Sequence, residues 1–190
     1  MLREAPDLGF PETKPPIESF RGRLVPKVSP RRRHGVLQLE IGAILQGWAR
    51  GRGDVATEWR FYLLPPKGRW SSLVPDVAYV SYERLPKNAP SAQREKPTIA
   101  PDLAIEVLSP NDSKRILDEK IELYLEFGAT AVLVVDPIRA ALFGLTGGVR
   151  ERGSARARRL PTRTFRVSRS TSRRCLQRRI ESTKRSPAAR

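Results

Sequence analysis

The sequence contains one histidine, His34, and one cysteine, Cys175, among 190 residues. A zinc site built from histidine and cysteine needs about four such ligands, so this class of site is excluded. A single cysteine cannot form an internal disulfide bond, which fits a reducing compartment, and we expect a cytoplasmic protein. A Ser-His-Asp hydrolase could use only His34, and nothing near it resembles a nucleophile elbow.

Long apolar runs are also missing. A membrane span needs about 18 consecutive apolar residues, and the sequence contains no stretch of that length. We therefore expect no contact with the membrane. Residues 1–16 are polar and proline-rich, without the apolar segment of a secretory signal. The pattern Gly-x-x-x-x-Gly-Lys-Ser/Thr is absent as well, which argues against a loop that cradles nucleotide phosphates.

Acidic residues are scarce in the last 40 residues and common in the rest of the chain. Residues 1–150 contain 22 Lys and Arg against 18 Asp and Glu, a balance of +4, whereas residues 151–190 contain 14 against 2, a balance of +12. Most of the net charge of +16 therefore belongs to the last 40 residues. The high overall charge is thus weak evidence that the folded part binds nucleic acid.

Acidic side chains interrupt two apolar segments. Asp76 opens the run Pro75–Val80, and Asp102 and Glu106 lie within the run 101–108. Because side chains alternate along a strand, Asp102 and Glu106 share one face. A carboxylate in an apolar strand is costly unless a cation pairs with it, and a divalent metal would serve. The pattern therefore predicts a metal site at these strands.

Two expected helices each carry a charge inside an apolar arc. At about 100° per residue, Lys120 falls among apolar side chains in a helix over residues 113–127, and so does Glu40 in a helix over 31–49. Lys120 either extends to solvent along its aliphatic stem or meets a buried anion. The carboxylates just before the helix favour the second interpretation. Glu40 either joins the same polar site or turns toward an arginine, and both alternatives are open.

The order of the elements predicts an α/β domain. Strands are expected at residues 55–64, 73–81, 101–108 and 131–136. The turn-forming residues 65–68 suggest a hairpin between the first two strands. A strand-helix-strand crossover implies parallel pairing of 101–108 with 131–136.

Several motifs together resemble one known family. They are Arg33-His34 at the start of a helix, Pro75–Ser81, Glu83–Pro86, Pro101–Pro110, Lys120, Tyr124, Gly128 and Val134–Pro137. They look like the motifs of the Uma-two-like putative restriction endonucleases, part of the PD-(D/E)XK nuclease superfamily, and the resemblance extends over residues 25–140. It implies a restriction-endonuclease-like core, in which a mixed central sheet is flanked by helices.

The resemblance also implies roles for individual residues. Asp76 and Glu106 would be the acids that hold the metal, and Glu40 the acid contributed by the first helix. The superfamily lysine normally stands two residues after the second acid, where this chain has Leu108. The resemblance therefore implies that Lys120, from the following helix, supplies the ammonium group instead.

These residue types suit metal-dependent hydrolysis of phosphodiesters. Mg²⁺, or Mn²⁺ in its place, takes carboxylate oxygens and water as ligands, and it activates water and neutralises charge on phosphate. We expect an endonuclease that cuts DNA, with Asp76, Glu106 and Asp102 as candidate metal ligands. Asp102 is alternatively a cap at the start of its strand. A catalytically silent nucleic-acid-binding relative and a non-functional reading-frame remnant are the other hypotheses, and the oligomeric state is open, a homodimer included.

The sequence divides into three parts. Residues 1–30 form a proline-rich lead-in, 31–145 the nuclease domain, and 146–190 a basic tail rich in arginine and serine. The scattered apolar residues of the tail predict disorder. It is either a basic arm that binds phosphates or, as we prefer, a segment foreign to the family, produced by translation in a shifted frame.

Overall fold

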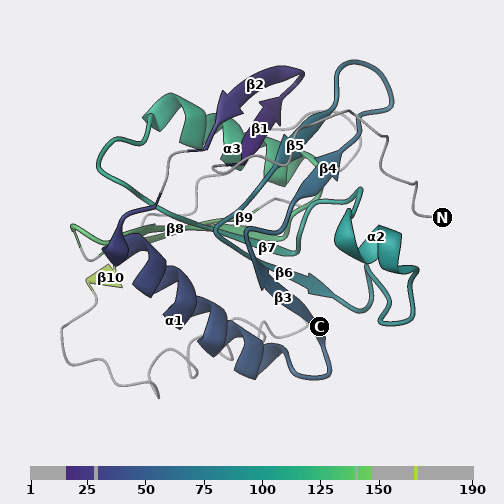
Figure 1. Ribbon diagram of the computed structural model, residues 1–190, viewed down its shortest axis with the longest axis horizontal. Coiled ribbons are helices and arrows are strands. Elements are labelled where there is room, and N and C mark those ends of the chain that lie inside the picture. The colour runs from purple at the N-terminus through teal and green to yellow at the C-terminus, as the bar shows by residue number, and fades with distance from the viewer. Residues whose placement is uncertain (1–15, 28–29, 140, 147–164, 167–190) are drawn as a thin grey trace, which may run out of the picture.

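A computed structural model describes residues 16–27, 30–139, 141–146 and 165–166 (Figure 1). Within these residues the chain forms a six-stranded sheet and a four-stranded sheet, together with three helices. The tail predicted to be disordered or frame-shifted, residues 146–190, lies outside the described residues except for residue 146 and the two residues 165–166.

The larger sheet is mixed. Its order is β10-β9-β8-β7-β6-β3. The strands are β3 Gly53–Thr57, β6 Val77–Ser81, β7 Leu103–Val107, β8 Ala131–Asp136, β9 Ala141–Thr146 and β10 Phe165–Arg166. Strands β7 and β8 are parallel, and every other neighbouring pair in this sheet is antiparallel. The predicted crossover is confirmed, because helix α3, Lys114–Glu126, connects β7 to β8.

The smaller sheet has the order β2-β1-β5-β4. Its strands are β1 Ile17–Phe20, β2 Arg23–Pro26, β4 Phe61–Leu63 and β5 Ser71–Leu73. The predicted hairpin exists as β4–β5, but the strands expected over 55–64 and 73–81 are each divided between the two sheets. Glu58, with φ of 54°, ends the first part, and the proline at position 75 separates β5 from β6. The predicted lead-in over residues 1–30 contains a hairpin of this sheet, which the sequence analysis missed.

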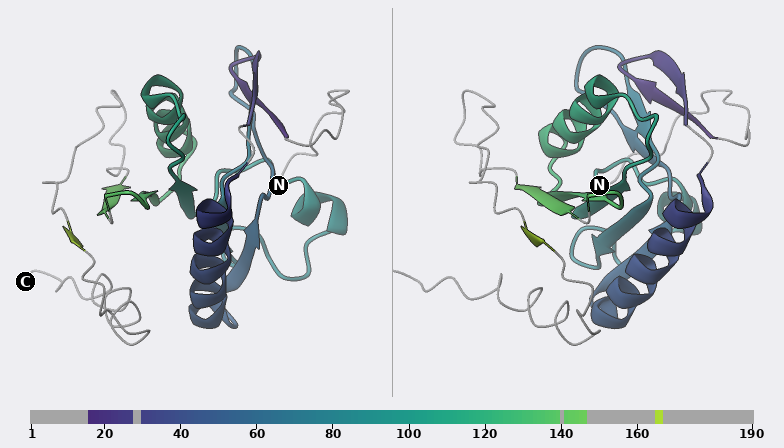
Figure 2. Two further views of the ribbon diagram at one scale, coloured as in Figure 1. Left: turned by 60° about the vertical axis from the view of Figure 1, so that its left-hand side comes forward. Right: turned by 90° about the vertical axis from the view of Figure 1, so that its left-hand side faces the viewer.

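Two helices cover opposite faces of the larger sheet (Figure 2). Helix α1, Arg32–Ala49, packs on β3 and β6, and α3 packs on the other face. The alternation of side chains along β6 explains both contacts: Val77 and Tyr79 join the cluster around α1, whereas Ala78 and Val80 join the cluster around α3. The short helix α2, Ser91–Glu95, lies in the connection between β6 and β7.

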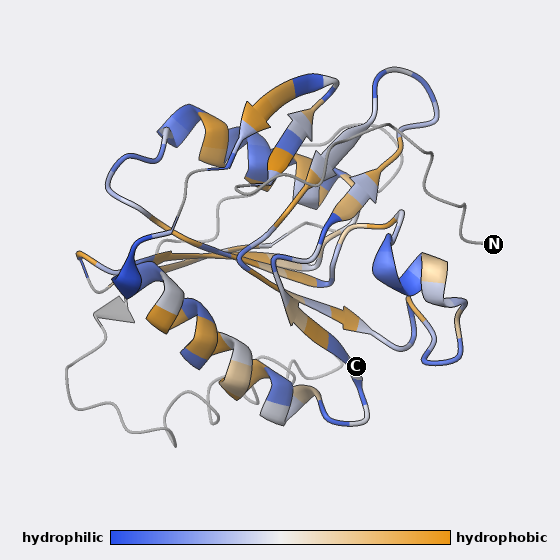
Figure 3. Ribbon diagram, in the orientation of Figure 1, coloured by the Kyte–Doolittle hydropathy of each residue, from blue (hydrophilic) through white to orange (hydrophobic). Residues whose placement is uncertain are grey.

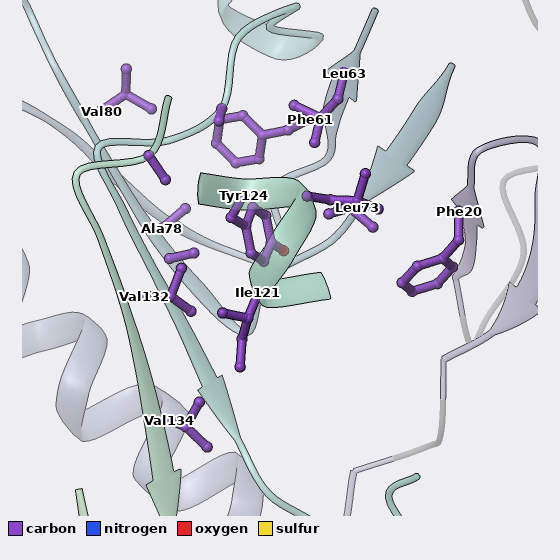
Figure 4. Packing of buried hydrophobic residues seen from close by; sticks show 14 of the residues in the cluster. Phe20, Phe61, Leu63, Leu73, Ala78, Val80, Ile121, Tyr124, Val132 and Val134 are labelled. Atoms are coloured by element: carbon purple, nitrogen blue, oxygen red, sulfur yellow. The ribbon is translucent and has the colours of Figure 1, made fainter. Parts of the chain in front are cut away.

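The main hydrophobic core lies between α3 and both sheets (Figure 4). Tyr124 and Ile121 of α3 face Val132 and Ala78 of the larger sheet, and Phe61 of the smaller sheet belongs to the same cluster. Fixing α3 in this way also fixes the direction of its polar side chains, among them Lys120. Among the described residues, no helix is long and apolar enough to cross a membrane.

Candidate functional site

Three buried carboxylates line one pocket of about 200 Å³. Asp76 immediately precedes β6, and Glu106 lies in the neighbouring strand β7, where Ile105 pairs with Val77. Strand pairing therefore brings these two acids to one end of adjacent strands. The third acid, Glu18, comes from β1 of the smaller sheet. The pocket lies where the β1–β2 hairpin, the starts of α1 and α3 and the larger sheet meet.

Glu106 and Lys120 form a buried ion pair. The Lys120 Nζ donates to Glu106 Oε2 at 2.8 Å and lies 3.1 Å from Glu18 Oε1. The Tyr124 hydroxyl, one helical turn after Lys120, donates to the other oxygen of Glu106 at 3.1 Å. Of the two interpretations of Lys120, the structure has the buried one, since only 5% of the residue is exposed.

Burial and charge act in opposite directions on these groups. Burial raises the pKa of Glu106 to about 7, although the Lys120 ammonium opposes the shift. Burial alone would lower the pKa of Lys120, but Glu106 and Glu18 raise it above its ordinary value. Lys120 therefore keeps its proton, and Glu106 is the group whose charge changes near neutral pH.

Asp76 is held by three groups on two sides. Its Oδ2 accepts a hydrogen bond from the backbone amide of Val107 at 2.7 Å and lies 3.0 Å from His34 Nε2. Its Oδ1 lies 2.7 Å from the Lys27 ammonium, yet within the described part of the chain this oxygen accepts no hydrogen bond of good geometry. Burial would raise the pKa of Asp76, but His34 and Lys27 lower it well below its ordinary value.

Lys27, which the sequence analysis missed, sits in a cage of oxygen atoms. Besides Asp76 Oδ1, its Nζ contacts both oxygens of Glu58 at 3.0 and 2.8 Å and the carbonyl of Val74 at 3.0 Å. Burial would lower the pKa of Lys27, but the charge of Asp76 raises it. Gln38 completes the cage by donating to Glu58 and to the Asp76 carbonyl, both at 2.8 Å.

His34 is a second site residue for which the sequence predicted only a position at the start of a helix. Only 7% of His34 is exposed, and the residue lines the pocket. Its hydrogen bond with Asp76 is the main cause that raises its pKa. Among the described residues its Nδ1 has no hydrogen-bond partner. Its position just after three arginines gave no signal of burial, because the partner, Asp76, is 42 residues away.

The structure does not bring Glu40 to the pocket, contrary to the position expected for a catalytic acid from the first helix. The residue is exposed and does not line the pocket. The buried face of α1 is formed by His34, Gln38, Leu45 and Ala49. Gln38 lies two residues before Glu40, so the two side chains point about 200° apart. The helix turns its polar residues inward because His34 and Gln38 find hydrogen-bond partners beside β6.

Asp102 also lies outside the pocket, so it is not placed to be a metal ligand beside Glu106. It stands before β7, accepts a hydrogen bond from the Ser81 amide at 2.7 Å and forms an ion pair with Arg84 at 3.4 Å. Four residues separate it from Glu106, about 13 Å along an extended strand. Its position fits the other interpretation given above, in which Asp102 caps the start of a strand.

The comparisons with known proteins agree with this fold. The sequence matches the Uma2 family, described as putative restriction endonuclease, over residues 4–170. This match is longer than the resemblance over residues 25–140, at both ends. A crystal structure of a putative nuclease belonging to DUF820 from Anabaena variabilis ATCC 29413 is similar, with a TM-score of 0.68 and 24% sequence identity. The likeness covers 83% of this chain and 80% of that one, and it confirms the predicted mixed sheet flanked by helices. No curated protein matches the chain.

Proposed function

Because this chain belongs to the Uma2 family of putative restriction endonucleases, we propose that it is a metal-dependent endonuclease that hydrolyses phosphodiester bonds of DNA. The family and the nuclease-like fold already indicate a hydrolase acting on nucleic acid. The observation that supports the finer proposal is the convergence of Asp76, Glu106 and Lys120 on one pocket. Two acids and an ammonium group are the residue types that this chemistry requires.

The donor atoms of the pocket fit a hard divalent cation. Glu18, Asp76 and Glu106 offer carboxylate oxygens, the ligands that Mg²⁺ prefers, and Asp76 Oδ1 is buried without a hydrogen bond from any described residue. Among the described residues, these carboxylates are in contact with the ammonium groups of Lys27 and Lys120 and with the His34 imidazole. Within the part of the chain that the structure describes, no three His, Cys, Asp or Glu side chains are grouped so that they could hold a metal ion as they stand, and two lysines lie among the acids of the pocket.

Lys27 occupies the position that a cation would take beside Asp76 Oδ1. For a metal to bind there, the ammonium has to move away, and Glu58 already contacts it on the other side. Lys27 would therefore compete with a bound metal, and Glu58 would hold the displaced ammonium. Without a metal, the Lys27 ammonium stabilises the site, since a buried carboxylate without a countercharge is costly.

The proposed roles follow from these contacts. Asp76 and Glu106 would hold Mg²⁺, which supplies an activated water and neutralises charge on the phosphate. Lys120 keeps Glu106 oriented and places an ammonium near the charge that develops on the phosphate. His34 and the Val107 amide fix the orientation of Asp76. Tyr124 fixes the second oxygen of Glu106.

Replacing Lys27 by methionine is expected to tighten Mn²⁺ binding about tenfold, which corresponds to about 1.4 kcal/mol. The methionine keeps most of the side-chain volume but removes the competing charge from Asp76. Isothermal titration of the metal-free protein measures the dissociation constant. Lys67→Met, at an exposed lysine in the turn between β4 and β5, is the matched control. Equal or weaker binding by Lys27→Met would exclude the competition.

Cleavage at subsaturating Mg²⁺ is expected to rise with pH up to about 7 and then level off. Glu106 binds a metal only as a carboxylate, and burial raises its pKa to about 7. Below this value the rate should fall up to about tenfold per pH unit. Tyr124→Phe removes a donor that favours the carboxylate, so its profile should move to higher pH. Identical profiles for the two proteins would show that another group controls the rate.

A catalytically silent nucleic-acid-binding protein is the second candidate. It is favoured by the ion pairs of the two acids, because Lys27 pairs with Asp76 and Lys120 with Glu106. The two candidates differ in a plasmid-cleavage assay with added Mg²⁺ or Mn²⁺. A silent protein would bind the plasmid without nicking it at any metal concentration.

A further inference from the structure

Three consecutive arginines, Arg31, Arg32 and Arg33, form an exposed basic patch at the start of α1. Figure 3 shows this end of the helix as strongly hydrophilic. We call it the Arg31–Arg33 patch. It carries three positive charges over three adjacent residues, and chain connectivity places it beside the pocket, because the next residue, His34, lines that pocket.

The patch has no acidic partner among the described residues. Some other exposed arginines are paired, Arg21 with Glu126 and Arg23 with Glu119, whereas Arg50 and Arg69 resemble the patch in having no acidic partner among the described residues. The first turn of α1 contains no acidic residue, and no side chain caps the helix. The charges of the patch and the free amide groups of the first turn therefore both favour an anion from outside the chain.

The rim at the start of α3 carries charges of both signs, because Asp112 lines the pocket there and Arg115 follows it. Helix α3 begins there: its N-cap Ser113 and its residue Leu117 line the pocket. Arg115, in its first turn, is exposed and has no acidic partner among the residues described. In Figure 1 both α1 and α3 begin toward the left of the molecule. Positive charge therefore flanks the acidic pocket on two sides.

The size of the pocket limits how much of a nucleic-acid strand can enter it. A water molecule takes about 30 Å³ of liquid, so a pocket of about 200 Å³ holds roughly six or seven waters. That space suits one phosphodiester group with its ion and water, not the neighbouring nucleotides. The next phosphates along a strand have to lie outside the pocket, at its rims.

We infer that the Arg31–Arg33 patch and Arg115 bind the DNA backbone on the two sides of the phosphate that enters the pocket. This inference rests on the proposed function, because it identifies the backbone of the same substrate. The partner is a DNA duplex recognised through its phosphates, which carry no base information. The patch sets affinity and position, and the acids inside the pocket perform the chemistry.

The test is the salt dependence of binding by the full chain. Glu106→Gln prevents cleavage, and anisotropy of a labelled 20-base-pair duplex gives the association constant over a range of salt concentrations. In this background Arg31→Gln/Arg32→Gln/Arg33→Gln should reduce the slope of log K against log salt by about 2 to 3, at about 0.9 per phosphate contact. Adding Arg115→Gln should reduce it by about one more.

The charge-matched control is Arg50→Gln/Lys67→Gln/Lys87→Gln. These three residues are also exposed, and Arg50 follows the far end of α1, about 27 Å from the patch by helix length. The control should leave the slope unchanged. Equal losses in both triple variants, or no loss in either, would overturn the inference. If the wild type cuts no DNA but the slopes differ as expected, the proposed function fails while the patch stands.

Discussion

Lys120→Met is expected to reduce DNA cleavage by about 100- to 1,000-fold or more and to destabilise the fold by about 3–5 kcal/mol. The substitution removes the cation that lies 2.8 Å from Glu106 and 3.1 Å from Glu18. Both carboxylates then remain buried without this countercharge, and the pKa of Glu106 rises further, so the group is protonated at neutral pH. Denaturant unfolding and a plasmid-cleavage assay measure the two effects.

A double variant separates stability from catalysis. Glu106→Gln added to Lys120→Met replaces the buried ion pair by neutral groups of similar size, which is often close to neutral in stability. We expect the double variant to recover the part of the unfolding free energy that the unpaired Glu106 costs, while Glu18 still lacks its countercharge, and to recover none of the cleavage. Lys114→Met is the control on the same helix, because Lys114 is exposed and, within the described part of the chain, its ion pair is with Asp118. Cleavage by the stable double variant would remove Lys120 and Glu106 from the mechanism.

Asp76→Asn is expected to abolish both cation binding and cleavage. Asparagine has nearly the same shape, but it removes the negative charge that Lys27 balances in the metal-free site. The Val107 amide and His34 would still find an oxygen acceptor, so the fold should persist. Titration with Mn²⁺ should show a dissociation constant raised by about 100-fold or more, since the substitution removes a carboxylate that would bind the metal directly.

Two acids outside the pocket serve as controls for Asp76. Asp102→Asn and Glu40→Gln remove carboxylates that the sequence also marked, but neither residue lines the pocket. Both variants should bind Mn²⁺ and cut DNA at the wild-type rate. Loss of activity in Glu40→Gln with an intact fold would restore the role that the family resemblance implied for this residue.

The sequence predicted the parts of the site that local patterns determine. The crossover from β7 through α3 to β8 follows from an apolar strand, an amphipathic helix and a second apolar strand in succession. Lys120 was recognisable because its charge interrupts the apolar face of that helix, and Glu106 because it interrupts an apolar strand. Each signal lies within about 20 residues of its partner, so a single segment reveals it.

The remaining site residues depend on contacts that no local pattern encodes. Glu18 and Lys27 reach the pocket only because β1 pairs with β5, a contact between Ser19 and Ser72. For α1, the sequence pattern did not show which face of the helix is buried. Apolar residues cover so much of the helix that one of them, Leu39, remains 72% exposed. Hydrogen bonds from His34 and Gln38 to groups beside β6 decide which face is buried.

The decisive experiment is nicking of a supercoiled plasmid, followed over a titration with Mg²⁺ or Mn²⁺. We expect the wild-type chain to cut the plasmid with metal and to leave it intact in chelator. We expect Glu106→Gln, folded to the same extent, to leave the plasmid intact at every metal concentration. Equal cutting by wild type and Glu106→Gln, or cutting that needs no divalent ion, would show that the acids of this pocket do not form a metal-dependent nuclease site.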